Sequence, residues 1–530
     1  CATKLIVPAG VTVKNLSADA TVENGTPVLS QGTKFTLAGN VVKGIPTTEE
    51  VVTDTLTITN GKYVKIIALS AMPANPLQGA GTAEDPYRIT TPQEWNALAS
   101  FMSKTANNLQ GEYVAVMNDI DFTGVAEGIT PLGNDGVTPF DGNFDGKGFA
   151  VKGYSYKTKE DGEGALFGTI GAEGVVSNLT SAGEISGGLG GPKGTTKLGH
   201  VGGFVGRLYG KLVNVTNTGK VKGIATYNAG VAGFVQQGAV LDGVKNYGEI
   251  TSSAAYVAGV AAYVYEDAEF NKCVNYGNIS SSVAAGYAAG IAATALPSKF
   301  VECVNEGQIS SGSSAGIVAN CSGKSGGLIY TFDRCQNNGE VTGNGILGGI
   351  TAVQGATAGN NVCHYIQCVN NGDITATATQ AVSSSAMAGI AAFYSPGSVF
   401  EYCINTGFVT NTKSVYTAGI AANNKGSATA DYPVVFKGCV NTGNIASSAQ
   451  QIAGIVAYIT NYTSVDSCLN YGTIEQGIWG AAGICYTMAG TTSSLTNCIN
   501  YGDVSVTQYN AGGIVGNCAS TTAVIENCVN

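Results

Sequence analysis

The sequence predicts an all-β protein built as a right-handed parallel β-helix, a solenoid in which each coil of chain stacks on the one before it. The first observation is a signature of a small residue (usually Cys), any residue, Asn, any residue, Gly, any residue and Ile or Val, which recurs ten times between residues 215 and 504. The second is a small-Gly-apolar-small-small run in most repeats, as at 289–293 and 453–457. The third is the lack of helical periodicity within repeats of 29 to 36 residues. A fixed period of this kind indicates stacked repeats.

Each repeat contains two or three short β-type runs separated by Gly, Asn and Ser. We therefore expect about three strands per coil, each pairing with its equivalent one coil later at a spacing of about 4.8 Å. The connection between such parallel strands is right-handed in nearly all proteins.

The Asn of the signature is predicted to have two structural roles. It tolerates the left-handed backbone region, so it suits the turn between two sheets. Stacked Asn side chains also hydrogen-bond from coil to coil, and we expect such a ladder. Its members are Asn217, Asn246, Asn275, Asn305, Asn337, Asn370, Asn405, Asn441, Asn470 and Asn500.

Nine of the fourteen cysteines, from Cys273 to Cys528, occupy the first position of the signature, so they are predicted to stack. Val215 and Val244 take that position in earlier repeats, which favours buried free thiols that fill the core over disulfides. A bulky apolar residue lies three positions before each Cys. Simple alternation places the two on opposite faces of a strand, unless a bend lets both point inward.

The chain divides into three predicted regions. Residues 1–77 read as a small β-sandwich-like or meander region, with irregular coils of the helix as the alternative. Residues 78–185 form the N-terminal cap and first coils, including a short amphipathic helix that starts at Thr91-Pro92 and turns Trp95, Leu98 and Met102 to one face. Residues 186–530 are a repeat β-helix of about eleven coils that ends in mid-repeat, so we expect further chain or a partner at this end.

Composition excludes several function classes. The formal net charge is −10, which argues against a nucleic-acid partner because no basic stripe is present. The sequence contains no run of 18 or more apolar residues, so no membrane-spanning helix is predicted. His200 and His364 are the two histidines and no Cys-x-x-Cys pair occurs, so neither a metal site nor a cofactor is expected.

Cys1 is a candidate lipidation site. Signal peptidase leaves a Cys as the first residue of mature bacterial lipoproteins, and that Cys carries the acyl chains. An arbitrary sequence boundary is the alternative. We expect an outer-membrane lipoprotein, at the cell surface rather than on the periplasmic face, held to the membrane through its lipid anchor alone.

The candidate ligand-binding residues are aromatic. The residue after the signature Asn is Tyr in four repeats, which form two adjacent pairs on an outward turn; Trp479 is a lesser candidate in a loop. Exposed aromatic rings suit sugars or a protein partner, whereas stacking that stiffens the turn is the structural alternative. The pairs are Tyr247 with Tyr276 and Tyr471 with Tyr501.

A catalytic alternative rests on Glu340 and Asp373, which occupy equivalent positions in successive repeats. Their spacing of about 5 Å would resemble the carboxylate pair of a retaining glycosidase. The competing interpretation is a solvated polar stripe that also includes Lys220, Glu249, Asn278, Gln308 and Asp503. No Arg or Lys cluster accompanies the two carboxylates, so an enzyme is not expected.

Five motifs together resemble one family. They are Gly-Thr-x-x-Asp-Pro-Tyr at 81–87, Glu-Trp-Asn-x-Leu at 94–98, Asn-Asp-Ile-Asp-Phe at 118–122, Phe-Asp-Gly-x-Phe-Asp-Gly at 140–146 and Leu-Phe-Gly at 166–168. The series resembles the GLUG-type repeat proteins, which are exported bacterial proteins common in gut Bacteroidota and also found in some immunoglobulin-A peptidases outside the protease domain.

The resemblance covers about residues 80 to 530. It implies a β-helical, adhesin-like, secreted or surface-anchored protein and transfers no catalytic residue. The sequence therefore predicts a non-catalytic exported lipoprotein that binds protein or glycan through an elongated face. The alternatives are an accessory subunit of an outer-membrane protein complex and a carbohydrate-active enzyme on a β-helix scaffold.

Overall fold

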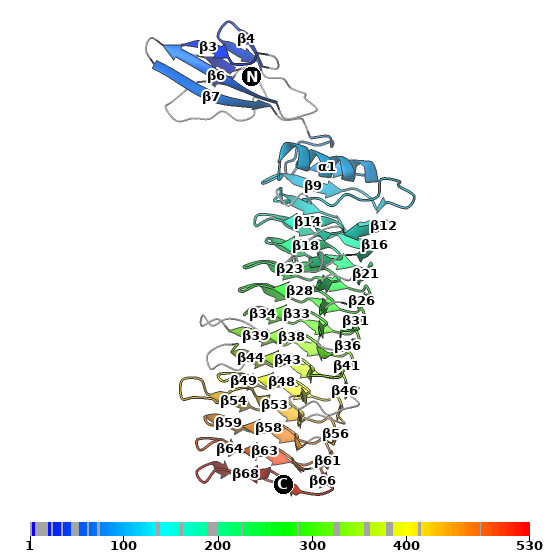
Figure 1. Cartoon of the computed structure of the whole chain (residues 1–530), viewed down its shortest axis with the longest axis vertical. Helices are drawn as coiled ribbons and strands as arrows, with labels where there is room; N and C mark the ends of the chain where they lie inside the picture. The colour runs from blue at the N-terminus through cyan, green and yellow to red at the C-terminus, as the bar shows by residue number, and fades with distance from the viewer. Residues whose placement is uncertain are drawn as a thin grey trace.

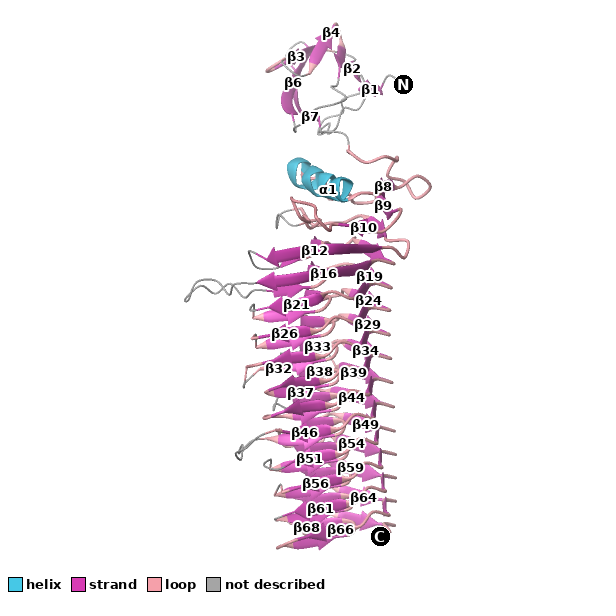
Figure 2. Cartoon of the chain, turned by 90° about the vertical axis from the view of Figure 1, so that its right-hand side faces the viewer, coloured by secondary structure: helices cyan, strands magenta, loops and turns pink. Residues whose placement is uncertain are grey.

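A computed structural model shows a parallel β-solenoid of about 13 turns that is preceded by one short helix and a small β region (Figure 1). Strands of successive turns lie side by side along the rod, as the rotated view shows (Figure 2). The all-β, parallel solenoid predicted from the repeats is confirmed. The structure describes residues 3–5, 20–22, 25–32, 35–43, 52–60, 63–71, 75–133, 138–158, 163–187, 200–223, 226–253, 255–283, 286–321, 329–354, 361–377, 385–411, 415–448, 450–477 and 479–530.

One coil contains five short strands that belong to four sheets. We call the sheets 1 to 4 in the order in which the chain visits them; they hold 15, 23, 12 and 12 strands. The expectation of about three strands per coil was wrong, because sheet 2 takes two very short strands from each coil. In a typical coil the strands are β29 (Glu269–Asn271) in sheet 1, β30 (Val274–Asn275) and β31 (Ile279–Ser281) in sheet 2, β32 (Tyr287–Ala289) in sheet 3 and β33 (Ala292–Ala295) in sheet 4.

Every strand of this coil pairs in parallel with its equivalent in the next coil, and equivalent residues lie opposite each other. Phe270 is opposite Phe300, and Asn275 is opposite Asn305. Each position of the repeat therefore forms a column of side chains along the rod. A column has a spacing of about 4.8 Å between neighbouring residues.

A single left-handed residue bends the chain between sheet 1 and sheet 2. Lys272 has φ 51°, and Glu302 and Arg334 hold the same place in the next two coils with φ 52° and 50°. The bend turns both the bulky residue before it and the Cys after it inward, so Phe270 and Cys273 are both fully buried. The sequence left this possibility open, but its assignment of the left-handed turn to Asn275 was wrong, because Asn275 lies in strand β30.

The signature Asn residues form the predicted ladder. Each Nδ2 donates one hydrogen bond to Oδ1 of the Asn in the next coil at 2.7–2.8 Å, from Asn217 through to Asn530. It donates a second to the carbonyl of the signature Gly in its own coil at 2.8–3.0 Å. From Asn217 to Asn500 these side chains are buried, so the ladder satisfies polar groups that water does not reach.

Two glycine positions per coil make this close approach possible. A Cβ added to Gly277, in the signature, would lie 2.0 Å from the carbonyl oxygen of Gly248 in the previous coil. A Cβ added to Gly290, in the small-Gly-apolar run, would lie 2.3 Å from Oδ1 of Asn305. The two sequence motifs are therefore sterically linked, because the signature Asn and Gly of a neighbouring coil occupy the space that a side chain would need at either glycine.

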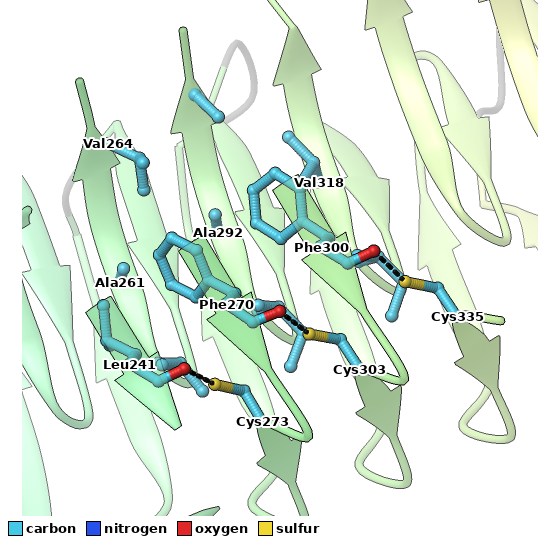
Figure 3. Packing of buried hydrophobic residues seen from close by; sticks show 14 of the residues in the cluster. Leu241, Ala261, Val264, Phe270, Cys273, Ala292, Phe300, Cys303, Val318 and Cys335 are labelled. Atoms are coloured by element: carbon cyan, nitrogen blue, oxygen red, sulfur yellow. Dashed lines mark hydrogen bonds between the residues drawn. The ribbon is translucent and has the colours of Figure 1, made fainter. Parts of the chain in front are cut away.

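The core is a set of stacked columns. Six aromatic rings stack at centroid distances of 4.6–5.3 Å from Phe270 to Phe436. Beside them, the thiol of Cys303 donates to the carbonyl of Phe270 at 3.4 Å, and Cys335 donates to Phe300 at 3.2 Å (Figure 3). All the described cysteines are free thiols, and those from Cys273 to Cys498 in this column are buried. The prediction of unbridged thiols that fill the core is confirmed for them.

Helix α1 (Pro92–Thr105) covers the first coils. Thr91 caps it in a capping box with Glu94, as the Thr-Pro start indicates. Trp95, Leu98 and Met102 are buried as predicted. Trp95 meets Phe144 and Phe167 edge to face at 5.7 and 6.1 Å. Phe144 lies in strand β11 (Asn143–Asp145), so the Phe-Asp-Gly-x-Phe-Asp-Gly motif at 140–146 contains a core strand.

The N-terminal region has two small sheets outside the solenoid sheets. Strands β1, β2, β5 and β4 form one sheet, and an antiparallel sheet contains β3, β6 and β7. Val22, Phe35, Val42, Leu56, Ile58, Ile67 and Leu69 form one buried cluster. The boundary at residue 77 stays a prediction. The strand bounds are β1 Thr3–Leu5, β2 Ala20–Val22, β3 Thr26–Leu29, β4 Thr36–Ala38, β5 Val41–Lys43, β6 Val52–Asn60 and β7 Tyr63–Ala71.

Candidate binding surface

The outward face of sheet 2 carries the candidate tyrosines. Along each coil the Asn and the β-branched residue of the signature point into the core, and the residues between them alternate outward. Three outward columns result: the residue after the Asn, the residue after the Gly, and the residue after the Ile or Val. We call this surface the sheet 2 face.

Both tyrosine pairs stack on this face. The Tyr247 and Tyr276 rings lie 4.4 Å apart at 9°, and Tyr471 and Tyr501 lie 4.8 Å apart at 10°. The rings remain 41–60% exposed. Six coils separate Tyr276 from Tyr471, about 29 Å along the rod at the usual strand spacing. Each ring therefore covers one face of its partner.

Trp479 does not join the tyrosine pairs. It lies between β61 (Ile474–Gly477) of sheet 2 and β62 (Gly480–Ala482) of sheet 3, at the far edge of the face. Its ring stacks on Tyr509 of the next coil at 5.1 Å and 4°, and both rings are about half exposed. Sequence reasoning missed Tyr509 because it lies outside the signature. The available signal was its position, which is equivalent to that of Trp479 one coil later.

The central part of the sheet 2 face is polar and tied together from coil to coil. Asn338 donates to Glu306 at 2.9 Å, Asn371 donates to Asn338 at 2.8 Å, and Thr406 donates to Asn371 at 2.8 Å. In the second column, side-chain oxygens accept from the backbone of the next coil. Asn278 accepts from Gln308 N at 3.0 Å in this way.

The proposed carboxylate pair belongs to this second column. Val341 is opposite Ile374, which places Glu340 and Asp373 side by side in adjacent coils as predicted. Asp373 Oδ1 accepts a hydrogen bond from Phe408 N in the following coil at 2.9 Å. Asp373 and Asn278 thus both accept a hydrogen bond from the backbone of the next coil. This supports a structural role for Asp373.

Phe408 is the residue that sequence reasoning missed. It occupies the second outward column, where the other coils have Lys220, Glu249, Asn278, Gln308, Glu340, Asp373, Asn444, Thr473 and Asp503. Its side chain is 53% exposed. The available signal was this single apolar residue in a column that is otherwise polar.

The sheet 2 face is acidic in the eight coils that follow the coil of Tyr247. The eight segments 274–281, 304–311, 336–343, 369–376, 404–411, 440–447, 469–477 and 499–506 contain no Lys, Arg or His. They contain five carboxylates, namely Glu306, Glu340, Asp373, Glu475 and Asp503. An anionic ligand would therefore meet unbalanced negative charge along most of this face.

Cys1, the candidate lipidation site, lies outside the described residues. His200 stacks on Tyr227 at 4.8 Å, whereas His364 lies on sheet 1. Within the described ranges, no group of three or more His, Cys, Asp or Glu side chains is arranged to hold a metal ion, and no helix is long and apolar enough to cross a membrane.

Comparisons with known proteins give limited likenesses. No family model matches the chain. Over 142 residues it is 29% identical to the "Putative Gly-rich membrane protein" of Evansella cellulosilytica, a match that covers 26% of this chain and 15% of that relative. The structure of a "putative immunoglobulin A1 protease from Bacteroides ovatus" superposes with a TM-score of 0.35 at 18% identity, over 59% of this chain and 86% of that one.

Proposed function

We propose that the protein is a non-catalytic, exported, adhesin-like protein of the GLUG type that binds protein or glycan through the sheet 2 face. We also propose that a lipid on Cys1 anchors it to the outer membrane at the cell surface. The observation that carries the binding proposal is the placement of two exposed, stacked tyrosine pairs on one straight face.

The exposed parts of these four tyrosine rings do not stabilise the hydrophobic core. Folding is driven by removing apolar surface from water, and rings that stay 41–60% exposed gain only part of that free energy. In other coils the same column holds Glu306, Asn338 or Thr442, so the fold accepts polar residues there. Aromatic rings that keep a polar hydroxyl at the surface are typical of binding sites.

The rigidity of the rod supports a binding role as well. The Asn ladder and the paired strands hold both tyrosine pairs on one continuous sheet, so the rings are positioned before any ligand arrives. Binding to a preorganised surface loses less conformational entropy than binding to mobile loops.

The test compares the wild-type chain with the double variant Tyr471→Ser/Tyr501→Ser on a glycan microarray and in pull-downs from outer-membrane extracts. Tyr209→Ser/Tyr432→Ser is the matched control, because these tyrosines are 40% and 42% exposed but lie off the sheet 2 face. We expect the first variant to lose at least about tenfold in affinity, which corresponds to about 1.4 kcal/mol. Equal binding by all three proteins, each folded by circular dichroism, would contradict the proposal.

The anchor is tested separately by intact-mass analysis of protein extracted from native membranes. An acylated Cys1 supports the anchor, and Cys1→Ala should then move the protein to the soluble fraction. An unmodified Cys1 in membrane-extracted protein would refute lipid anchoring without affecting the binding proposal.

A further inference from the structure

We infer that Phe408 is the platform of a sugar-binding subsite for a neutral polysaccharide on the sheet 2 face. The inference rests on the proposed function and narrows it, because it chooses glycan over protein as the ligand and names a contact residue between the tyrosine pairs. No sequence motif or comparison points to this residue.

Phe408 differs from the tyrosines in having no stacked partner. In its column the residues on either side are Asp373 and Asn444, and no aromatic ring among the described residues contacts it. Along the rod the ring therefore has a short polar side chain on either side rather than another ring. A pyranose presents an apolar C–H face and equatorial hydroxyls, and an aromatic ring beside polar groups fits both.

Polar side chains surround the ring on the same face. Thr406 and Thr410 alternate outward with Phe408 along the chain, and both are exposed. Asp373 Oδ1 accepts from the backbone N of Phe408, which fixes the carboxylate beside the base of the ring. Asn444 accepts from Thr473 N at 3.0 Å through Oδ1, which fixes its amide on the other side. The donors and acceptors are thus positioned before a ligand binds.

The fold gives no reason for an apolar residue at this place. The other coils have polar or charged residues in the column. Three of them, Asn278, Asp373 and Asn444, accept a hydrogen bond from a backbone N–H of the next coil through a side-chain oxygen. Phe408 has no such oxygen and remains 53% exposed. Its ring therefore neither continues the structural pattern nor buries itself.

Charge selects the class of sugar. The five carboxylates and the absence of Lys, Arg and His in the eight sheet 2 segments disfavour uronic-acid or sulfated polymers. The tyrosine pairs lie four coils before and two coils after Phe408 on the same face, in the neighbouring outward column, so the three aromatic contact points are spread along the rod. A linear neutral polysaccharide that lies along the rod can contact all three.

The test is affinity gel electrophoresis with galactomannan, xyloglucan or hydroxyethylcellulose in the gel, and with polygalacturonate as the anionic counterpart. Removal of one stacking contact is worth about 1–3 kcal/mol for a nucleobase, so we expect Phe408→Ala to weaken binding at least about fivefold. Phe408→Tyr should stay within about twofold. The matched control is Tyr402→Ala, since Tyr402 is 50% exposed in the same coil but lies at the bend before sheet 2.

The outcomes separate this inference from the proposed function. Retardation by a neutral polymer that Phe408→Ala weakens and Tyr402→Ala does not supports the subsite. Neutral binding that is lost in Tyr471→Ser/Tyr501→Ser but unchanged in Phe408→Ala overturns the subsite and keeps the binding face. Retardation by polygalacturonate alone, or capture of a protein through the sheet 2 face with no glycan binding, overturns the choice of a neutral polysaccharide. Binding that none of these variants alters overturns both proposals.

Discussion

Replacement of Asn370 by Ala tests the ladder at its centre. The Asn370 amide donates to the Gly372 carbonyl at 2.8 Å and to Asn405 Oδ1 at 2.8 Å, and its own Oδ1 accepts from Asn337 Nδ2 at 2.7 Å. Asn370→Ala removes all three bonds and leaves up to three polar groups without these partners in a region with no exposed surface. At about 1–3 kcal/mol for each buried unsatisfied group, the expected loss is about 3–9 kcal/mol.

The control is Asn371→Ala, one residue further along. Asn371 also makes two side-chain bonds between coils, to Asn338 and Thr406 at 2.8 Å each, but on the exposed face. Water replaces those bonds, so we expect a loss below about 1 kcal/mol.

The assay is amide hydrogen exchange resolved by coil, because a long repeat array need not unfold in one step and a single unfolding free energy is then undefined. We expect Asn370→Ala to lower the opening free energy of β40 (Gln336–Asn337), β45 (Val369–Asn370) and β50 (Ile404–Asn405), with little change several coils away. If Asn370→Ala and Asn371→Ala exchange alike, the buried amide ladder is not a major source of stability.

Three further predictions concern the same core. Gly339→Ala should lower the opening free energy of its coil by more than about 3 kcal/mol in coil-resolved hydrogen exchange, because the new Cβ would lie 2.0 Å from the carbonyl oxygen of Gly307; a loss below about 1 kcal/mol would refute the steric argument. Phe332→Ala should cost about 3–5 kcal/mol by the same measurement, since the ring is fully buried in the aromatic stack; a surface-like cost would mean that the stack is loosely packed. In a Cys1→Ala background, an aromatic disulfide reagent should react in the native state with Cys518 and Cys528 but with the eleven buried thiols only after unfolding, and rapid native reaction of all thiols would contradict the burial of the column.

The ladder and the thiol column were predictable because both follow from register alone. Residues that recur once per coil must stack when coils stack, and a buried amide or thiol has few alternatives to the neighbour above it. The left-handed bend was only partly predictable from residue type. Asn214 and Gly438 are of the types that favour this backbone region. In other coils Lys272, Glu302 and Arg334 hold the same place at a cost of about 1–2 kcal/mol each, so there the surrounding strand pairing imposes the conformation.

The number of strands was also beyond the sequence pattern. Strands of two residues, such as β30 (Val274–Asn275), are too short to show an alternation that periodicity can detect. Phe408 was missed although the signature aligns its column, because the sequence of one repeat does not show that an apolar residue at this position stays 53% exposed. The tyrosine pairs were placed correctly because both partners share one signature position.

The most direct test of the account is hydrogen exchange of the wild-type chain with and without the polysaccharide that retards it most strongly. A ligand on the sheet 2 face should slow exchange in the segments that follow the signature Asn, from β30 (Val274–Asn275) to β66 (Val504–Val506), and leave sheet 1 unchanged. Protection confined to sheet 1, to sheets 3 and 4 or to the N-terminal strands would show that the binding surface lies elsewhere and would contradict the central claim.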